Sequence, residues 1–139
     1  MSMIFVDTNY FIRFILKADS LQHTKVTVLF MSAARGEVAL CTPVAVFFEM
    51  FWVLTRVYEK PKNEVVVILT KVLKLSFIEF DERFLMQKAL SLYKKGTIEL
   101  EDYYNIAFAE FKNADTFASF DKKLQKTLSY NTPKHRKIV

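Results

Sequence analysis

The sequence has few of the residues on which several common kinds of site depend. Of its 139 residues, one is cysteine, two are histidine, two are glycine and three are proline. The single cysteine, Cys41, excludes a disulfide within the chain and favours a reducing compartment. One cysteine and two histidines also exclude a Cys/His zinc site. With Gly36 and Gly96 alone, neither the dinucleotide-binding glycine pattern nor the Walker phosphate loop can be written.

The scarcity of glycine and proline also disfavours an all-β sandwich, because its many turns need both residues. The composition, 52% hydrophobic and 25% charged, is typical of a folded globular chain. The length predicts one domain over residues 1–139. The formal net charge of +5 is compatible with a polyanionic partner.

The most apolar stretch, from Val38 to Leu54, approaches the roughly 20 residues that a membrane helix needs. It contains Pro43 and Glu49, however, and a carboxylate at mid-bilayer costs about 2.5–3.5 kcal/mol. We therefore interpret it as a strand followed by a helix. Because Asp7 interrupts the short apolar N-terminal run, no signal peptide is predicted. We expect a cytoplasmic protein without a membrane segment.

Short apolar runs predict buried parallel strands, and apolar residues at helical spacing predict helices between them. The predicted strands are Met3–Val6, Val38–Cys41, Phe77–Phe80, Thr116–Phe120 and Ile138–Val139. The predicted helices are Thr8–Lys17, Ser20–Ala34, Pro43–Tyr58, Glu64–Lys74, Glu82–Lys95, Glu101–Lys112 and Asp121–Leu128. This alternation predicts an α/β fold of three layers, in which helices flank a central, mostly parallel sheet of four to five short strands.

Short polar residues and glycines are predicted to mark helix ends. Thr42, directly before Pro43, and Asn63 are predicted N-caps. Gly36 and Gly96 are predicted to stop the helices that precede them.

Two aspartates follow predicted strands. Ligand sites in parallel sheets lie beyond the carboxyl ends of the strands. Asp7 occupies that place after the first strand and Asp121 after the fourth. Two interpretations remain open, because each aspartate is a suitable N-cap for the helix that follows, and both carboxylates can also enter one crevice.

Glu49 lies within an apolar helix. Its neighbours on the same face are all apolar: Ala45, Val46, Trp52 and Val53. A lone carboxylate among them costs several kcal/mol unless it is paired, protonated or bound to a metal. A buried pair with Arg56, two turns away, is the structural alternative.

A third group of acids begins a later helix. The helix dipole favours acids in a first turn by about 0.3–1 kcal/mol each, which suffices to explain at least one of Glu99, Glu101 and Asp102. Asp102 shares a face with the apolar Ile106 and Ala109, whereas Glu101 points elsewhere. Asp102 is therefore the candidate for a buried site, with Glu101 as the alternative.

Four candidate acids remain, namely Asp7, Glu49, Asp102 and Asp121. Two carboxylates about 4 Å apart repel by roughly 4 kcal/mol at an effective dielectric constant of 20, so four in one crevice need a cation. An all-oxygen site suits Mg²⁺ or Mn²⁺. A metal-bound water hydrolyses phosphodiesters, and a basic surface holds the nucleic acid backbone.

Four segments of the chain occur in an order that is characteristic of one family. They are Val6-Asp7-Thr8-Asn9, Phe48-Glu49, Asp102 at the start of a helix, and Ser119-Phe120-Asp121-Lys122-Lys123-Leu124. From Met3 to Leu128 the chain resembles the PIN-domain family, and within it the VapC-like toxins of toxin–antitoxin pairs. The resemblance implies an endoribonuclease specific for single-stranded RNA, in which the four acids bind one or two Mg²⁺ or Mn²⁺ ions.

The resemblance extends to supporting residues and partners. It implies that Thr8, Asn9 and Ser119 support the first and last acids through hydrogen bonds. It also implies a homodimer and a small antitoxin protein as partners. For contacts with RNA phosphates the candidates are Arg13, Lys17, Lys122 and Lys123, which otherwise belong to solvated faces.

The chain departs from the family pattern after the third acid. Small residues are common there, but this sequence has Tyr103, Tyr104 and Asn105. Two tyrosines can narrow a groove or stack on bases.

Two other functions compete with the nuclease. A catalytically silent PIN-fold domain that binds RNA or protein is one, although it has no need to hold repelling carboxylates together. A phosphatase of the haloacid dehalogenase type is the other. It needs a second aspartate two residues after the first, where this chain has Asn9.

Overall fold

The computed structural model describes residues 1–17, 20–131 and 137–138, which fall into two compact units. Unit 1 comprises Met1–Arg83 and unit 2 comprises Phe84–Val139. Within the described part of the chain, no helix is long and apolar enough to cross a membrane.

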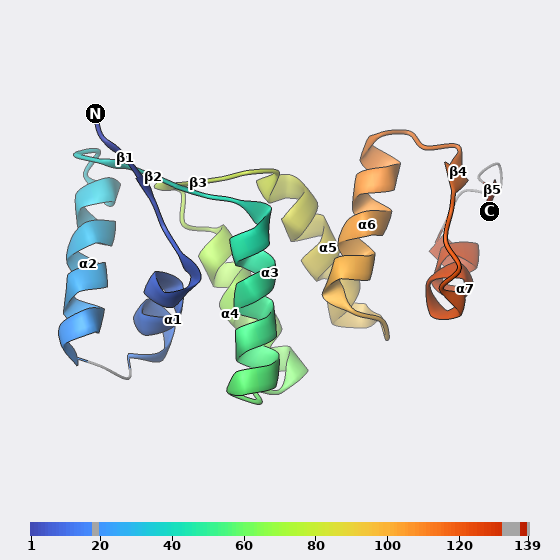
Figure 1. Cartoon of the computed structure of the whole chain (residues 1–139), viewed down its shortest axis with the longest axis horizontal. Helices are drawn as coiled ribbons and strands as arrows, with labels where there is room; N and C mark the ends of the chain where they lie inside the picture. Colours follow the sequence, from blue (N-terminus) through green and yellow to red (C-terminus); the bar gives the residue numbers. More distant parts are fainter. Residues whose placement is uncertain (18–19, 132–136, 139) are drawn as a thin grey trace. The chain divides into compact units, whose positions relative to one another are not determined.

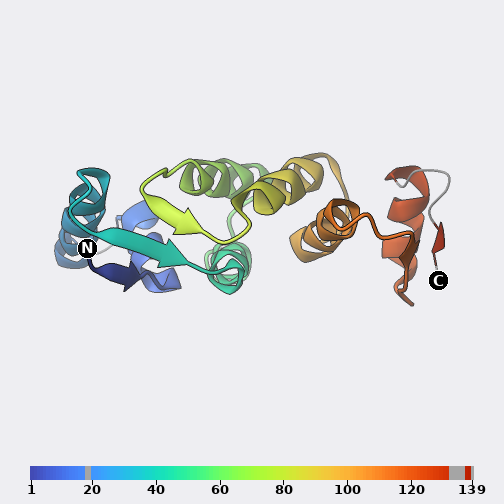
Figure 2. The ribbon, with the colours of Figure 1, turned by 90° about the horizontal axis from the view of Figure 1, so that it is seen from above.

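The sheet of unit 1 has three short parallel strands. These are β1 (Met3–Phe5), β2 (Ala39–Thr42) and β3 (Ile78–Phe80), in the order β1-β2-β3. Figure 2 shows them as dark blue, teal and yellow-green arrows that point the same way. In register, Cys41 lies between Phe5 and Glu79. The predicted α/β class with a parallel sheet is confirmed.

The helices of unit 1 lie against one face of this sheet. They are α1 (Thr8–Leu16), α2 (Ser20–Ala34), α3 (Val44–Trp52) and α4 (Lys62–Leu73), and Figure 1 shows them on the same side of the strands. Leu40 and Ile78 are buried, whereas Met3 and Phe5 on the other face are exposed. Within residues 1–17 and 20–83, the helices therefore cover the face of the sheet that carries Leu40 and Ile78.

Neither Thr42 nor Asn63 is an N-cap. Thr42 is the last residue of β2, and its buried hydroxyl donates to the carbonyl oxygen of Val6 at 2.8 Å. Pro43 is the N-cap of α3 and makes no side-chain capping bond. Asn63 lies inside α4, whose N-cap is Pro61. In both cases the proline is itself the extended residue directly before the helix, and its fixed φ suits that conformation. The proline therefore sets where the helix starts.

The predicted helix Pro43–Tyr58 changes type partway along. It is α-helical to Trp52 and continues as the π-helix η1 (Val53–Val57). The Thr55 hydroxyl donates to the carbonyl oxygen of Phe51 at 2.7 Å. Such bonds from threonine back to the preceding turn distort an α-helix, and π-turns of this kind are often found at functional sites.

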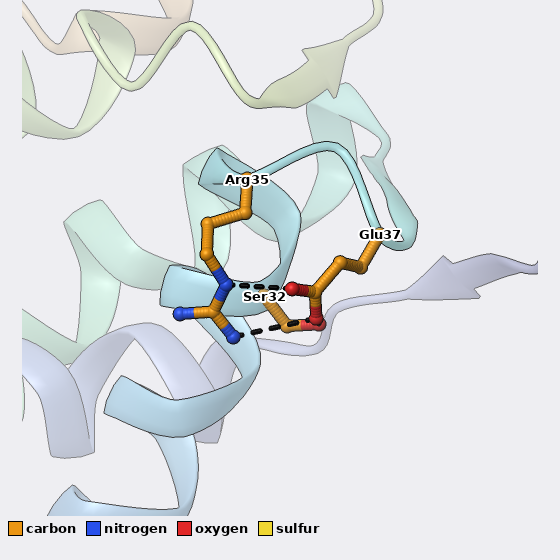
Figure 3. A network of polar contacts seen from close by, with 3 residues as sticks. All are labelled: Ser32, Arg35 and Glu37. Carbon is orange, nitrogen blue, oxygen red and sulfur yellow. Dashed lines mark hydrogen bonds and ion pairs between the residues drawn. The ribbon is translucent and has the colours of Figure 1, made fainter.

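The connection from α2 to β2 is closed by an exposed polar network (Figure 3). Gly36 has a φ of +76°, which confirms its role in ending the helix. The Arg35 guanidinium donates to Glu37 through Nε at 2.6 Å, and the Ser32 hydroxyl donates to Glu37 at 2.9 Å. These hydrogen bonds, the one from Arg35 foremost, lower the pKa of Glu37. The network holds the conformation of the turn. Because it is exposed to solvent, it contributes little to the stability of unit 1.

Arg83, the last residue of unit 1, ties α4 to β3. Its guanidinium donates to the carbonyl oxygens of Leu73, Leu75 and Ile78, the second at 3.2 Å, and lies 4.8 Å from the centre of the Phe80 ring. Burial lowers the pKa of Arg83. The guanidinium therefore satisfies carbonyl groups at the C-terminal end of α4, a role that the sequence analysis did not assign.

In residues 84–131 and 137–138, unit 2 has three helices and two very short strands. The helices are α5 (Arg83–Lys95), which starts at the boundary, α6 (Leu100–Phe111) and α7 (Lys122–Asn131). The strands β4 (Thr116–Phe117) and β5 (Lys137–Ile138) pair in parallel with each other. The predicted strands are thus divided between a sheet of three and a sheet of two. Val139, predicted as strand, lies outside the described residues.

Candidate active site

The four predicted acids are divided between the two units. Asp7 and Glu49 belong to unit 1, and Asp102 and Asp121 belong to unit 2. In residues 1–17, 20–131 and 137–138, no group of three or more histidine, cysteine, aspartate or glutamate side chains could hold a metal ion. The site of four carboxylates therefore stays a prediction. Asp7 and Glu49 are described within unit 1, and Asp102 and Asp121 within unit 2.

Asp7 is the N-cap of α1. Its Oδ1 atom accepts a hydrogen bond from the backbone N–H of Thr8 at 2.8 Å, and the residue is exposed at the carboxyl end of β1. The prediction that Asp7 can cap the helix after the first strand is confirmed. A cap of this kind uses one carboxylate oxygen, so it is compatible with a second role for the same side chain.

Glu49 is exposed, contrary to the expectation that its carboxylate lies on a buried apolar face. The buried side chains of α3 are Val46, Phe47, Met50 and Phe51. The face that holds Glu49 also carries Ala45, which is exposed, and Trp52, which is 56% exposed. Glu49 therefore carries no large desolvation cost in unit 1, and the argument from burial was wrong.

Asp102 is the candidate acid with a perturbed environment. It is half-buried in the first turn of α6. Burial raises its pKa, and the nearby negative charge of Asp121 raises it further, as that of Glu99 does to a smaller degree. A hydrogen bond from the backbone N–H of Glu99 opposes this by lowering the pKa. Asp102 and Asp121 thus lie close enough to repel each other.

Asp121 is held by hydrogen bonds at the start of α7. Its Oδ1 atom accepts from the backbone N–H of Leu124 at 2.9 Å, and its own N–H donates to the Ser119 hydroxyl at 3.1 Å. The Ser119 carbonyl oxygen accepts from the Gln125 side chain at 2.5 Å. Ser119 therefore supports the last acid through the backbone, and the exposed lysines 122 and 123 follow it directly.

The geometry also bears on the choice between Glu101 and Asp102. Glu101 is exposed, whereas Asp102 is half-buried, and burial, followed by the negative charge of Asp121, raises its pKa. Asp102 therefore stays the predicted third acid, with Glu101 as the alternative.

The donor chemistry of this pair fits a hard divalent cation. Mg²⁺ prefers oxygen ligands and is commonly held by one or two carboxylates, with water and substrate phosphate completing its shell. The pKa of Asp102 is raised first by burial and then by the charge of Asp121, and a bound cation would offset the second of these contributions. The residues of unit 2 thus fit Mg²⁺ or Mn²⁺ in ligand type.

The residues of α1 and its C-cap that were predicted to contact RNA or to support the acids differ in their surroundings. Arg13 donates through Nε to the Gln22 side chain at 2.5 Å, which ties α1 to α2. Lys17 is exposed and ends α1 in a left-handed conformation, with a φ of 55°. Asn9 is exposed in the first turn of α1.

Thr8 has a buried hydroxyl. The residue is 2% exposed, and its Oγ1 atom has no hydrogen-bond partner among the described residues. Its bond to Asp7 is made by the backbone N–H. We therefore expect Thr8→Val, which keeps the shape and removes the hydroxyl, to raise the free energy of unfolding by about 1 kcal/mol, as measured by urea titration.

Thr42→Val is the matched control for this prediction. Thr42 is 3% exposed, and its hydroxyl donates to Val6 at 2.8 Å, so the same substitution should lower the free energy of unfolding by about 1 kcal/mol. A loss of stability in both variants would show that the Thr8 hydroxyl is bonded in solution.

Tyr103 differs from what the sequence suggested. It is 3% exposed, and its hydroxyl accepts a hydrogen bond from the backbone N–H of Thr97 at 3.0 Å. A buried ring neither narrows a groove nor stacks on bases, so that interpretation was wrong for Tyr103. The signal that the sequence analysis missed was Gly96, seven residues earlier, which makes room for this hydroxyl.

Comparison with known proteins bears on the whole chain. The sequence profile of one protein family, described as the PIN domain, matches residues 4–128. The match runs through both units and includes all four predicted acids. A comparison with curated proteins found no match. The α/β fold with its parallel sheet is consistent with the family that matches.

Proposed function

The chain belongs to the PIN domain family, which is generally a family of nucleases that bind Mg²⁺, and from this membership we propose that it is a metal-dependent endoribonuclease. Its substrate in this proposal is single-stranded RNA, and its reaction is phosphodiester hydrolysis. The observation that supports the proposal best is that two of the four predicted acids, Asp102 and Asp121, belong to the same unit, where burial and then the charge of Asp121 raise the pKa of Asp102.

In this proposal the carboxylates of Asp102 and Asp121 hold the ion. When bound, a metal ion would activate a water molecule and stabilise negative charge on the phosphate. Ser119 and the N-terminus of α7 orient Asp121, and the backbone N–H of Glu99 orients Asp102. Asp7 and Glu49 are included as further catalytic acids on the strength of the sequence pattern.

Basic residues would hold the RNA backbone. The chain carries a formal net charge of +5, and Lys122 and Lys123 are exposed next to Asp121. Lys17 is exposed as well, whereas Arg13 is engaged by Gln22 and is the weaker candidate. Binding through such contacts should weaken steeply as the salt concentration rises, because bound phosphates release counterions.

The biological role in this proposal is that of the toxin of a toxin–antitoxin pair. A homodimer and a small antitoxin protein are the partners that it requires, and the cytoplasm, suggested by the single cysteine, is the compartment. The resemblance to VapC-like toxins supports this role, and co-purification with the product of the neighbouring reading frame would test it.

The decisive experiment is an RNA cleavage assay with Mg²⁺ or Mn²⁺, with and without EDTA. We expect cleavage by the wild type that EDTA abolishes, and no cleavage by Asp7→Asn. Asparagine caps a helix as well as aspartate does, so the variant loses charge and keeps the fold. Asp81→Asn is the matched control, since Asp81 directly follows β3 of the same sheet and is not among the predicted acids.

Three results would count against this proposal. Equal cleavage by wild type and Asp7→Asn would remove Asp7 from the mechanism. Cleavage that persists in EDTA would remove the metal. RNA binding without cleavage in any metal would leave the silent binding domain as the function.

A further inference from the structure

A tyrosine closes the connection between α5 and α6 in unit 2. The ring of Tyr103 is buried in the first turns of α6, and it lies 6.4 Å from the ring of Tyr93 on α5 in an edge-on arrangement. Its hydroxyl reaches the connecting segment and accepts the hydrogen bond from the N–H of Thr97 at 3.0 Å. One side chain therefore contacts both the helix that precedes the connection and the connection itself.

Gly96 is glycine because of this tyrosine. A Cβ atom on residue 96 would lie 1.5 Å from the Tyr103 hydroxyl oxygen and 2.2 Å from the ring carbon that bears it. Those distances are far inside van der Waals contact, so no larger residue fits while Tyr103 stays in place. Gly36, with its positive φ, is glycine for a different reason, namely backbone conformation. Gly96 and Tyr103 thus form a matched pair of neighbours.

The same connection leads directly into the candidate site. It ends at Glu99, the N-cap of α6, whose carbonyl oxygen accepts from the N–H of Asp102 at 3.1 Å. Asp102 immediately precedes Tyr103 on the helix. We call the hydrogen bond between the Thr97 N–H and the Tyr103 hydroxyl the clamp. It holds the segment that leads into the first turn of α6, where Asp102 lies. Tyr103, which makes this bond, is the residue directly after Asp102.

We infer that Tyr103 is a positioning residue that holds the carboxylate of Asp102 in place for the metal ion, with Gly96 as the residue that admits it. The functional part of this inference rests on the proposed function. It also accounts for the departure from the family pattern, since a tyrosine after the third acid acts here through the backbone of the connection and does not touch substrate.

The expected effect is one on metal affinity. Groups that orient a metal ligand typically contribute 10–100-fold to affinity or activity, because a displaced carboxylate no longer meets the coordination geometry. Tyr103→Phe removes only the hydroxyl and releases the N–H of Thr97. We expect it to weaken Mn²⁺ binding about tenfold and to raise by a similar factor the Mn²⁺ concentration that gives half-maximal cleavage. The KM for RNA should stay within about twofold, because Tyr103 is buried away from substrate.

Three measurements test this inference. Calorimetric titration of the metal-free protein with Mn²⁺ gives the affinity, steady-state cleavage separates kcat from KM, and hydrogen exchange reports protection of the Thr97 amide. Leu90→Val shortens a buried side chain of α5 and serves as the control. This variant should retain Mn²⁺ affinity, so it separates positioning from a general loss of stability.

The outcomes distinguish this inference from the proposed function. If Asp102→Asn loses Mn²⁺ binding and cleavage while Tyr103→Phe behaves like Leu90→Val, the inference is wrong and the nuclease proposal stands. If Asp102→Asn binds Mn²⁺ and cleaves RNA as the wild type does, the proposed role of Asp102 is wrong. Rapid exchange of the Thr97 amide in the wild-type protein would overturn the clamp without recourse to any variant.

Discussion

Asp102→Asn is expected to reduce RNA cleavage by at least about 100-fold, because a neutral amide replaces a carboxylate that would carry the charge of a metal ligand. The loss should appear in kcat at saturating RNA, measured by the cleavage assay in Mg²⁺. Glu101→Gln is the matched control, since Glu101 is exposed one residue earlier on α6 and should tolerate the change. Equal losses in the two variants would contradict the assignment of Asp102 over Glu101.

The same substitution should change how the stability of the metal-free protein depends on pH. The pKa of Asp102 is raised in the folded protein, so the folded state binds this proton more tightly than the unfolded chain does. The ionised carboxylate of Asp102 therefore destabilises the folded protein fully at pH values above its folded-state pKa. This destabilisation disappears as the pH falls below the ordinary pKa of an aspartate in an unfolded chain. We expect the metal-free variant to be slightly more stable than the wild type at neutral pH, by about 1 kcal/mol or less for a partly exposed group.

Calorimetric unfolding between pH 3 and pH 8, in EDTA, measures this effect. The difference between wild type and Asp102→Asn should shrink toward low pH, where the carboxyl is protonated in both the folded and unfolded states. A variant that is less stable than the wild type at neutral pH would show that the carboxylate is favourably paired, and would remove the repulsion with Asp121 on which the metal argument depends.

Arg83→Ala is expected to lower the free energy of unfolding of unit 1 by about 3 kcal/mol, because charge-assisted hydrogen bonds each contribute about 1.5–3 kcal/mol and several carbonyl groups lose their donor at once. The guanidinium donates to Leu73, Leu75 and Ile78 and stacks on Phe80, contacts that one small ammonium group cannot reproduce. Arg83→Lys should therefore recover less than half of the loss.

The chain offers a selective probe and a control for this experiment. Its one tryptophan, Trp52, lies in unit 1, so the fluorescence change in urea reports on that unit. Arg35→Ala removes an exposed arginine whose partner is the solvated Glu37, and it should leave the free energy of unfolding unchanged within the error of the titration. If the two alanine variants unfold alike, the carbonyl contacts of Arg83 contribute nothing measurable.

Local signals in the sequence were sufficient for most of the fold. The alternation of apolar runs and helical periodicity predicted the order of strands and helices. The helix α2 ends at Ala34 as predicted and begins at Ser20, the residue that was predicted to cap it. Gly36 ended that helix as expected, with the left-handed conformation that glycine adopts without cost. The errors lie at helix starts, where Pro43 and Pro61 took the place predicted for Thr42 and Asn63. A proline restricts its own backbone and therefore outweighs a weak capping preference.

The sequence by itself determined the α/β class, the succession of elements and the candidate acids, because these depend on residue types and on spacing within one segment. Only the tertiary structure decided that Glu49 is exposed and that Arg83 donates hydrogen bonds to carbonyl groups at the end of α4. Only the tertiary structure decided, too, that burial and the charge of Asp121 raise the pKa of Asp102. It likewise decided that Tyr103 is buried against Gly96. Burial, electrostatic repulsion and side-chain contacts arise between residues distant in the chain, and periodicity within one helix says which residues share a face but not which face is covered.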